Sequence, residues 1–404
     1  MTLDLTAIYK DLHTNPELSF QETRTAGIVA GHLRELGFDV TEGVGRTGVV
    51  GVLSNGEGPT VLLRADMDGL PVQEQTGLEY ASTARGTDPD GKDVPVMHAC
   101  GHDVHVTCLL GAAEQLAAEK DAWGGTLVTV FQPAEEAGGG ASEMIADGFL
   151  DRFPRPDVVL GQHVAPIPAG FIGLTPGPAM AAADSLNITL HGTGGHGSRP
   201  EATVDPVYLA ANVINRLQGV VSREISALDT AVVTVGQVHS GTKNNIIADH
   251  AVLGLSVRSY REEVRTKVLA AVERIAQAES AASNAPKEPT VEYFERFPVT
   301  VNDPSASERV ATVLRSVLGE HSVLNPGPLS GSEDVGEFAT AAGVPLVYWF
   351  LGGGDPALAE IVAKTGRMPD EVPSNHSPFF APVIDPTLGN GVKALVSTAR
   401  EFLG

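Results

Sequence analysis

The chain has 404 residues, of which 42% are hydrophobic, and a formal net charge of -23. This length allows a large core and exceeds that of one ordinary compact domain, so we expect two domains. An acidic chain without a Lys/Arg run is a poor partner for a phosphate backbone, which argues against a nucleic-acid-binding protein. With only two cysteines, no basic apolar leader and no long apolar run, we expect a cytoplasmic protein that neither carries a disulfide framework nor spans a membrane.

The first part of the chain has the pattern of an α/β domain. Apolar periodicity predicts a helix over residues 22–36, and short β-branched runs follow it. Three runs are apolar enough for buried strands, and polar groups follow each of them: 60–65, 126–131 and 157–160. Ligands bind beyond the carboxyl ends of the strands in open α/β sheets, so we expect a functional site there.

A second pattern interrupts the first over residues 184–296. Strands and helices are expected in the order β-α-β-β-α-β, at residues 185–190, 204–221, 231–238, 251–257, 262–282 and 290–294. This is the ferredoxin-like α+β arrangement. The α/β pattern returns with a strand at 343–348 and a closing helix at 386–403. We therefore expect a discontinuous domain of residues 1–183 and 297–404, with a second domain of residues 184–296 inserted into it.

The stretch from Met97 to His105 holds one thiol and three imidazoles in nine residues. Cys100 and His102 flank a glycine, so in an extended chain both side chains leave the same face and can reach one metal site. No second Cys-x-x-Cys or His-x-x-x-His pair follows. Any metal must therefore recruit its remaining ligands from distant segments.

Other segments supply candidate ligands. Glu135 and Glu136 follow a predicted strand. One interpretation is that the two carboxylates simply form a solvated surface pair without a function, as most such pairs do. The functional interpretation is that one carboxylate binds metal while the other accepts a proton. His163 at a strand end is either a hydrogen-bonded structural histidine or a ligand. His376, in a proline-flanked loop, is either a solvent-exposed histidine or a ligand.

Five further residues are ambiguous from the pattern alone. Asp66 and Asp68 alternate at a strand end, where an aspartate either caps a turn or holds a ligand imidazole. His196 lies in a glycine-rich hairpin, and Asn245 lies in a polar segment of the inserted domain. Arg258 ends a predicted strand and either pairs with a carboxylate or stays solvated.

Taken together, the segments resemble the M20 metallopeptidases, and specifically the amidohydrolase subfamily of aminoacylases, hippurate hydrolases and auxin-conjugate hydrolases. Six segments carry the resemblance in the family's order: RADMDGLP (64–71), MHACGHDVH (97–105), QPAEE (132–136), GHGSRP (195–200), GSED (331–334) and NHSP (375–378). The fold that this implies is a zinc-exopeptidase-like α/β catalytic domain with a mixed central sheet, plus an inserted lid and dimerisation domain.

The resemblance also implies a site for two divalent metal ions, with zinc expected first and manganese, cobalt or nickel as alternatives. The implied ligands are Cys100, His102, Glu136, His163 and His376. Glu135 is the implied general base, and Cys100 is the implied bridge between the metals, where other members of the wider superfamily use an aspartate. Asp66 occupies the position of a metal-binding histidine in those relatives and is not counted as a ligand. Asp68 matches their catalytic-site aspartate, which orients that histidine.

For the inserted domain, the resemblance implies that it closes over the site and forms a homodimer. His196, donated by the partner subunit, would help to stabilise the oxyanion, while Asn245 and Arg258 would contact the substrate. Many relatives have proline at the position of Ala248, a departure that removes no functional group.

The expected activity is cleavage of the amide bond of N-acyl amino acids. A dipeptidase or carboxypeptidase on the same scaffold is the alternative within enzymes. A catalytically silent metal- or ligand-binding relative is the alternative outside them. The acyl and amino-acid specificity does not follow from the sequence.

Overall fold

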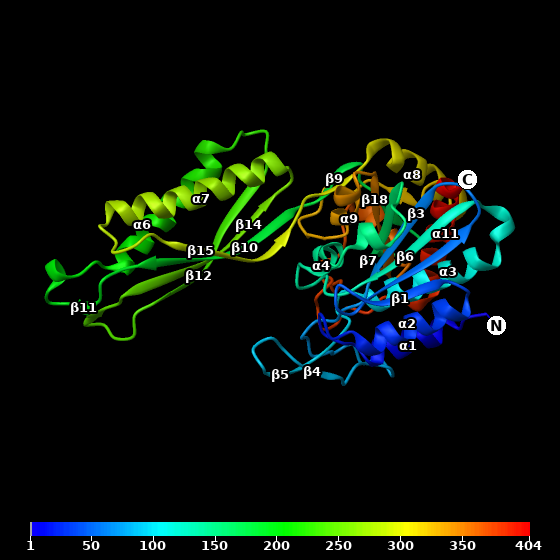
Figure 1. Cartoon of the computed structure of the whole chain (residues 1–404), viewed down its shortest axis with the longest axis horizontal. Coiled ribbons are helices and arrows are strands. Elements are labelled where there is room, and N and C mark those ends of the chain that lie inside the picture. The colour runs from blue at the N-terminus through cyan, green and yellow to red at the C-terminus, as the bar shows by residue number, and fades with distance from the viewer. Residues whose placement is uncertain (1) are drawn as a thin grey trace. The chain divides into compact units, whose positions relative to one another are not determined.

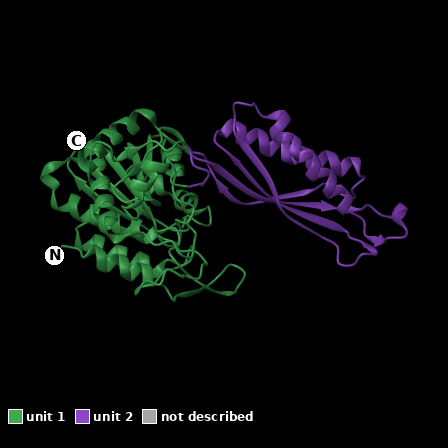
Figure 2. Cartoon of the chain, turned by 180° about the vertical axis from the view of Figure 1, so that it is seen from behind, with its two compact units in different colours: residues 1–179, 301–327, 334–404 green, residues 180–300, 328–333 purple. Residues whose placement is uncertain are grey.

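The structure is a computed structural model that describes residues 2–404. The chain divides into two compact units, coloured separately in Figure 2. Unit 1 runs to Ala179 and also includes Val301–Gly327 and Asp334–Gly404, whereas unit 2 comprises Met180–Thr300 and Pro328–Glu333. Unit 2 thus takes in residues 180–183, 297–300 and 328–333, which the sequence-based boundaries give to the catalytic domain.

Within residues 2–404, unit 1 combines nine α-helices with a large sheet. The helices are α1 (Leu5–Thr14), α2 (Thr23–Glu35), α3 (His102–Ala118), α4 (Gly140–Ala146), α5 (Phe149–Arg152), α8 (Pro304–Leu318), α9 (Gly336–Ala342), α10 (Leu358–Thr365) and α11 (Ile384–Leu403), with a short 3-10 turn, η1 (Lys120–Ala122). No helix within residues 2–404 combines the length and the apolar character that crossing a membrane requires.

The central sheet of unit 1 has eight strands in the order β1-β2-β6-β3-β7-β18-β8-β17. Their bounds are β1 (Asp39–Val44), β2 (Gly48–Asn55), β3 (Thr60–Asp66), β6 (Gly125–Gln132), β7 (Val158–Pro168), β8 (Ile172–Gly173), β17 (Val323–Leu324) and β18 (Leu346–Gly354). Parallel pairing joins β6, β3, β7 and β18, while β1 and β2 add antiparallel strands at one edge. This confirms the predicted mixed central sheet.

The central strands are buried because they carry apolar side chains on both faces. In β3, every residue from Val61 to Asp66 is buried. The helices α2, α3, α8 and α11 contact strands of this sheet, α1 packs on α3, and together they enclose a single large core; Figure 1 shows α3 and α11 next to the strands. The neighbouring strands β6, β3 and β7 run parallel, so their carboxyl ends meet at the same edge. The three predicted buried strands therefore deliver their polar groups to one place.

Short strands complete the chain outside the two main sheets. They include β4 (Arg85–Thr87) and β5 (Asp93–Pro95), which pair with each other, and β9 (Gly177–Met180) and β16 (Thr300–Asn302), which also pair with each other. Both β9 and β16 contain a residue at which the chain passes from one unit to the other.

Unit 2 is built from a four-stranded antiparallel sheet and two helices. Its elements are β10 (Ala182–His191), β11 (Gly195–His196), η2 (Pro200–Ala202), α6 (Pro206–Gly219), η3 (Val220–Glu224), β12 (Ala231–Ser240), β13 (Ile246–Ile247), β14 (His250–Ser259), α7 (Glu262–Ala282) and β15 (Thr290–Phe297). The sheet order β12-β14-β10-β15 is the ferredoxin-like one that the β-α-β-β-α-β pattern predicts. Both helices pack on one face of the sheet, and together they enclose a separate apolar core.

Candidate metal centre

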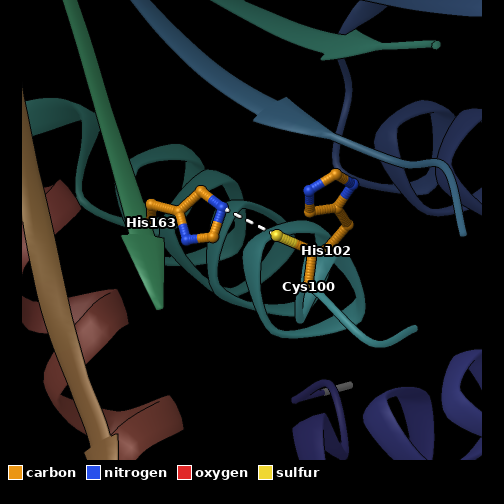
Figure 3. A group of neighbouring side chains, drawn as sticks. All are labelled: Cys100, His102 and His163. Atoms are coloured by element: carbon orange, nitrogen blue, oxygen red, sulfur yellow. Dashed lines mark hydrogen bonds between the residues drawn. The ribbon is translucent and has the colours of Figure 1, made fainter. Parts of the chain in front are cut away.

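Cys100 and His102 reach the site through a turn. Gly101 has a φ of +85° and precedes the first residue of α3, so Cys100 and His102 approach each other through a left-handed turn and not through an extended chain. A Cβ atom at Gly101 would lie 2.3 Å from Val164 Cγ1, and only glycine fits both this space and this backbone conformation. The turn places the Cys100 thiol 3.4 Å from His163 Nε2, with His102 beside them, as Figure 3 shows.

His163 lies on β7, and its ring is oriented by its own strand. Its Nδ1 lies 2.8 Å from the carbonyl oxygen of Val164, to which it donates, so Nε2 carries the lone pair that faces Cys100. Burial, together with the neighbouring His105, lowers the pKa of His163 well below its usual value. A neutral imidazole with a free Nε2 lone pair is the form that binds a metal ion.

Glu135 and Glu136 lie in the loop that follows β6. Their backbone N–H groups donate to the two carboxylate oxygens of Asp68, at 3.1 and 3.0 Å. The side chains then approach His102 Nε2, with Glu135 Oε2 at 3.9 Å and Glu136 Oε1 at 3.8 Å. One aspartate therefore fixes the backbone of both glutamates beside the imidazole.

His376 comes from the loop between α10 and α11. Its backbone N–H donates to the carbonyl oxygen of Ala99 at 2.8 Å, and its Nε2 lies 3.3 Å from Glu136 Oε1. The Glu136 carboxylate at this distance raises the pKa of His376, although burial opposes it. Asn375 ties the same loop to the cluster, since its amide donates to the Cys100 carbonyl oxygen at 3.1 Å.

Both aspartates at the end of β3 are buried beside His102 and play different parts. Asp68 accepts from His102 Nδ1 at 3.2 Å, which leaves His102 Nε2 to face the cluster. Asp66 instead lies 2.5 Å from His105 Nδ1 and 2.5 Å from Arg64 Nη1, and it stands 3.7 Å from His102 Nε2. Burial alone would lower the pKa of His102, but Asp66 and Asp68 raise it to about 10 in the absence of a cation.

The residues brought together fit divalent metal ions. Two groups of three donors, Cys100 with His102 and His163, and Cys100 with Glu136 and His376, each have their donor atoms within 4.8 Å of one another. His102 Nε2 is buried and makes no hydrogen bond within residues 2–404. Burial and the Glu136 carboxylate raise the pKa of the Cys100 thiol, so a thiolate at neutral pH needs a nearby cation. Sulfur, imidazole and carboxylate donors in such a cluster suit zinc and related divalent ions.

The three predicted lid residues all belong to unit 2. His196 is exposed on β11, and its Nδ1 accepts a hydrogen bond from the Ser198 N–H at 3.1 Å. The Asn245 carbonyl oxygen accepts from the Gly197 N–H at 2.9 Å, so the segments of His196 and Asn245 lie side by side. Arg258 on β14 donates to the Ser330 carbonyl oxygen at 2.7 Å and to Ser332 Oγ at 3.1 Å. The guanidinium is therefore anchored at one nitrogen.

Sequence reasoning missed two residues that hold the site in place. Glu22 appeared only as the first residue of a helix, yet its carboxylate is fully buried and accepts from the Ala134 N–H. Asn375 precedes the predicted ligand His376 in the segment NHSP, and this position is a signal that could have identified it. Nothing in the local pattern around Glu22 indicates its role, because its partner lies 112 residues further along the chain.

Comparison with known proteins places the chain in a family. The model of peptidase family M20/M25/M40 matches residues 62–399. Thermostable carboxypeptidase 2 of Saccharolobus solfataricus is 40% identical over 85% of this chain and 84% of its own, and hippurate hydrolase of Campylobacter jejuni is 41% identical over 82% and 84%. The crystal structure of the Bacillus subtilis YXEP protein, described as a dinuclear metal-binding peptidase of the M20 family, superposes with a TM-score of 0.77 at 27% identity, over 99% of this chain and 97% of that one. A family match of this extent, together with the clustered metal donors, shows that the chain belongs to peptidase family M20/M25/M40 and is a metal-dependent hydrolase.

Proposed function

We propose that the protein cleaves the amide bond of N-acyl amino acids and releases a carboxylic acid and a free amino acid. The observation that carries the proposal is the pair Glu135 and Glu136, held by one aspartate at the cluster of candidate ligands. Glu136 lies 3.3 Å from His376, in a group of ligand atoms that also includes Cys100, which suits a metal ligand. Glu135 lies in a group of candidate donor atoms with His102 and Glu136, and this position beside the ligands suits a general base. The hippurate hydrolase of Campylobacter jejuni, at 41% identity, supports this substrate class by its name.

In this proposal, two divalent ions would be held by Cys100, His102, Glu136, His163 and His376. When bound, the ions supply Lewis acidity, which makes a water acidic enough to lose its proton near neutral pH and polarises the scissile carbonyl.

Glu135 performs the proton transfers. Its carboxylate takes the proton from the attacking water and later gives it to the leaving amine nitrogen, so that the base is regenerated. Asp68 acts on both glutamates and on His102 through hydrogen bonds, which makes it a positioning residue. Its complete burial supports this role over direct contact with the substrate.

Residues 184–296 would act as the lid and dimerisation domain over a catalytic domain of residues 1–183 and 297–404. Two observations support a homodimer through unit 2. The strand β12 is at the edge of its sheet, and it exposes Val232 and Val238 by 49% and 54%. His196 of the partner subunit would then stabilise the oxyanion, which agrees with its exposure on β11.

The substrate carboxylate would be bound by Arg258, with Asn245 as a second contact. One guanidinium nitrogen is anchored to the segment around Ser330, which leaves the other donors of the planar group for a carboxylate. Residues 328–333, which contain Ser330, belong to unit 2, as Arg258 does. Replacing Arg258 by Met should raise KM for N-benzoylglycine at least tenfold and leave KM for N-benzoylglycinamide unchanged, because only the first substrate carries the carboxylate.

Zinc is the first expectation for the native metal, with manganese, cobalt or nickel as alternatives. A thiol among the ligands favours a reducing compartment such as the cytoplasm, because oxidation of Cys100 would remove the ligand. Metal analysis after reconstitution with each ion separately, followed by amine release from N-acetyl and N-benzoyl amino acids, identifies the ion that supports turnover.

The decisive variant is Glu135→Gln. It should retain two metal ions per chain and lose hydrolysis of N-acyl amino acids by several orders of magnitude, because the amide cannot accept the proton. Glu143→Gln is the matched control, since Glu143 pairs with Arg46 at the surface. Retention of activity by the Glu135→Gln protein would remove Glu135 from the role of base.

A carboxypeptidase or dipeptidase activity is the second candidate. The 40% identity to a protein named thermostable carboxypeptidase 2 favours it as the alternative. Comparing kcat/KM for N-benzoyl amino acids, N-blocked dipeptides and free dipeptides separates the candidates. A preference for either peptide class over the N-acyl amino acids would overturn the proposed substrate class. Two bound metals without turnover of any of these substrates would favour a silent metal-binding protein.

A further inference from the structure

The loop that carries Glu135 and Glu136 is held by three consecutive backbone N–H groups. Two of them donate to Asp68, as described above, and the third, from Ala134, donates to Glu22 Oε1 at 2.8 Å. The three acceptor oxygens come from two segments that are distant from the loop in the sequence. The backbone of the loop is thus fixed residue by residue by carboxylates.

The Glu22 carboxylate also accepts hydrogen bonds from two other segments of unit 1. Its side chain is fully buried, and its Oε1 also accepts from the Phe20 N–H at 2.9 Å, while Oε2 accepts from Thr47 Oγ1 at 2.5 Å. Although Glu22 precedes α2, its side chain makes no capping hydrogen bond to that helix. Burying a carboxylate costs several kcal/mol before its hydrogen bonds are counted, so helix formation does not explain its position.

Glu17, unlike Glu22, has the contacts of an acidic residue that stabilises the start of α2. Its carboxylate accepts from the N–H groups of Arg24 and Thr25, both at 2.8 Å, and its side chain is partly exposed. The structure therefore divides two tasks between two glutamates near the start of α2. Glu17 stabilises the first turn of the helix, and Glu22 reaches past it to the loop.

The loop conformation needs such a restraint. Ala134 has a φ of 49°, in the left-handed region that costs a non-glycine residue about 1 kcal/mol or more. The loop then passes so close to Gly140 that a Cβ atom there would lie 1.6 Å from the carbonyl oxygen of Pro133. A hydrogen bond to the Ala134 N–H selects this conformation, which turns the two following side chains toward the ligand cluster.

We propose that Glu22 is a positioning residue, whose hydrogen bond to the Ala134 N–H holds Glu135 and Glu136 at the metal centre. The inference rests on the proposed function for its effect on turnover, but its effect on metal binding does not depend on any substrate. Partners that orient metal ligands typically contribute 10- to 100-fold to metal affinity or activity. A displacement of about 1 Å in a catalytic group can cost about 100-fold in rate.

The test compares Glu22→Met and Glu22→Gln with the wild type and with Glu17→Gln as the control. Methionine fills a similar volume without offering an acceptor to Ala134. Glutamine keeps a carbonyl oxygen for the Ala134 N–H, and its amide can donate to the Thr47 hydroxyl, which rotates to accept. Metal affinity is measured by competition with a chromogenic chelator, and turnover on N-benzoylglycine gives kcat and KM separately.

We expect the Glu22→Met protein to lose at least tenfold in metal affinity and in kcat, with KM changed less than twofold. The Glu22→Gln and Glu17→Gln proteins should stay within threefold of the wild type in all three quantities. A Glu22→Met protein that melts earlier but binds metal and turns over normally would overturn the proposal, because the role would then be purely structural. An equal loss in Glu22→Gln would overturn it as well, because the charge of Glu22 and not its hydrogen bond would matter.

Two further arrangements keep the test decisive. If the Glu22→Met protein does not fold, Glu22→Ala is measured in the same way, with the same outcomes. If the wild type binds metal but hydrolyses no N-acyl amino acid, the proposed function fails. The chelator competition then still decides whether Glu22 holds the metal centre.

Discussion

His13 provides the sharpest test of the electrostatics of unit 1. Its imidazole lies at the end of α1, is 1% exposed, and stands between two buried carboxylates: Asp103 at 2.6 Å from Nδ1 and Glu74 at 3.1 Å from Nε2. Burial alone would lower the pKa of His13, but the hydrogen bonds to Asp103 and Glu74 raise it from 6.5 to about 10. The folded protein therefore holds a doubly paired imidazolium at neutral pH.

The sign of the pH dependence follows from that increase. Because the folded pKa lies above the unfolded one, the stabilisation is complete below pH 6.5 and is lost as the pH rises through about 10. The full contribution is about 5 kcal/mol, and roughly 3.5 kcal/mol of it should disappear between pH 6.5 and pH 9.5. The His13→Gln protein lacks this titration, so its deficit relative to the wild type should shrink as the pH rises.

The measurement is the thermal melting of metal-free protein followed by circular dichroism at the two pH values. At roughly 2 °C per kcal/mol for a unit of this size, the gap in Tm between wild type and His13→Gln should narrow by about 7 °C. His321→Gln is the control, since this exposed histidine lies in unit 1 outside the network. A gap that stays constant or widens toward pH 9.5 would refute the reasoning.

Three further predictions concern the metal centre. Gly101→Ala should lower metal affinity at least tenfold and reduce Tm, because the new Cβ meets Val164 in a left-handed turn; metal analysis after dialysis and a melting curve report both effects. Asp68→Asn should weaken metal binding by 10- to 100-fold, since its amide group can no longer accept from all of its donors; chelator competition measures this, and unchanged affinity would contradict the positioning role. Adding metal at about 1,000 times its Kd to metal-free protein should stabilise it by about 4 kcal/mol, read as a rise in Tm, and no rise would argue against the site.

The fold could largely be predicted because its signals are local. The apolar runs of the central strands and the periodicity of the helices can both be recognised within short stretches of consecutive residues. A run as apolar as β3 is compatible with few structures other than a strand buried on both faces. The expected strand at residues 126–131 is observed as β6 (Gly125–Gln132), and the expected helix at 22–36 as α2 (Thr23–Glu35).

The arrangement within the site was less accessible from the sequence. The ligand set came from a family resemblance that covers six segments, and the structure brings the five candidate side chains together. The left-handed turn at Gly101 was missed, because a glycine between two ligand candidates fits an extended chain equally well. The sequence did not indicate the hydrogen bond between Glu22 and Ala134 or the pairing of Asp66 with His105. Both are contacts between distant segments, and no local periodicity encodes such contacts.

The segment of residues 328–333 has a consequence for protein engineering. The chain passes from one unit to the other on both sides of this segment, in addition to the two passages that flank residues 180–300. An excision of residues 184–296 as a single cassette would leave Ser330 and Ser332 without Arg258, the side chain that binds them. Met180 would keep its bridge to Leu329 but lose the strand that continues from it. Transfer of unit 2 to another protein therefore requires both of its segments, residues 180–300 and residues 328–333. Hybrid proteins that receive only the first segment should misfold where the two segments would meet.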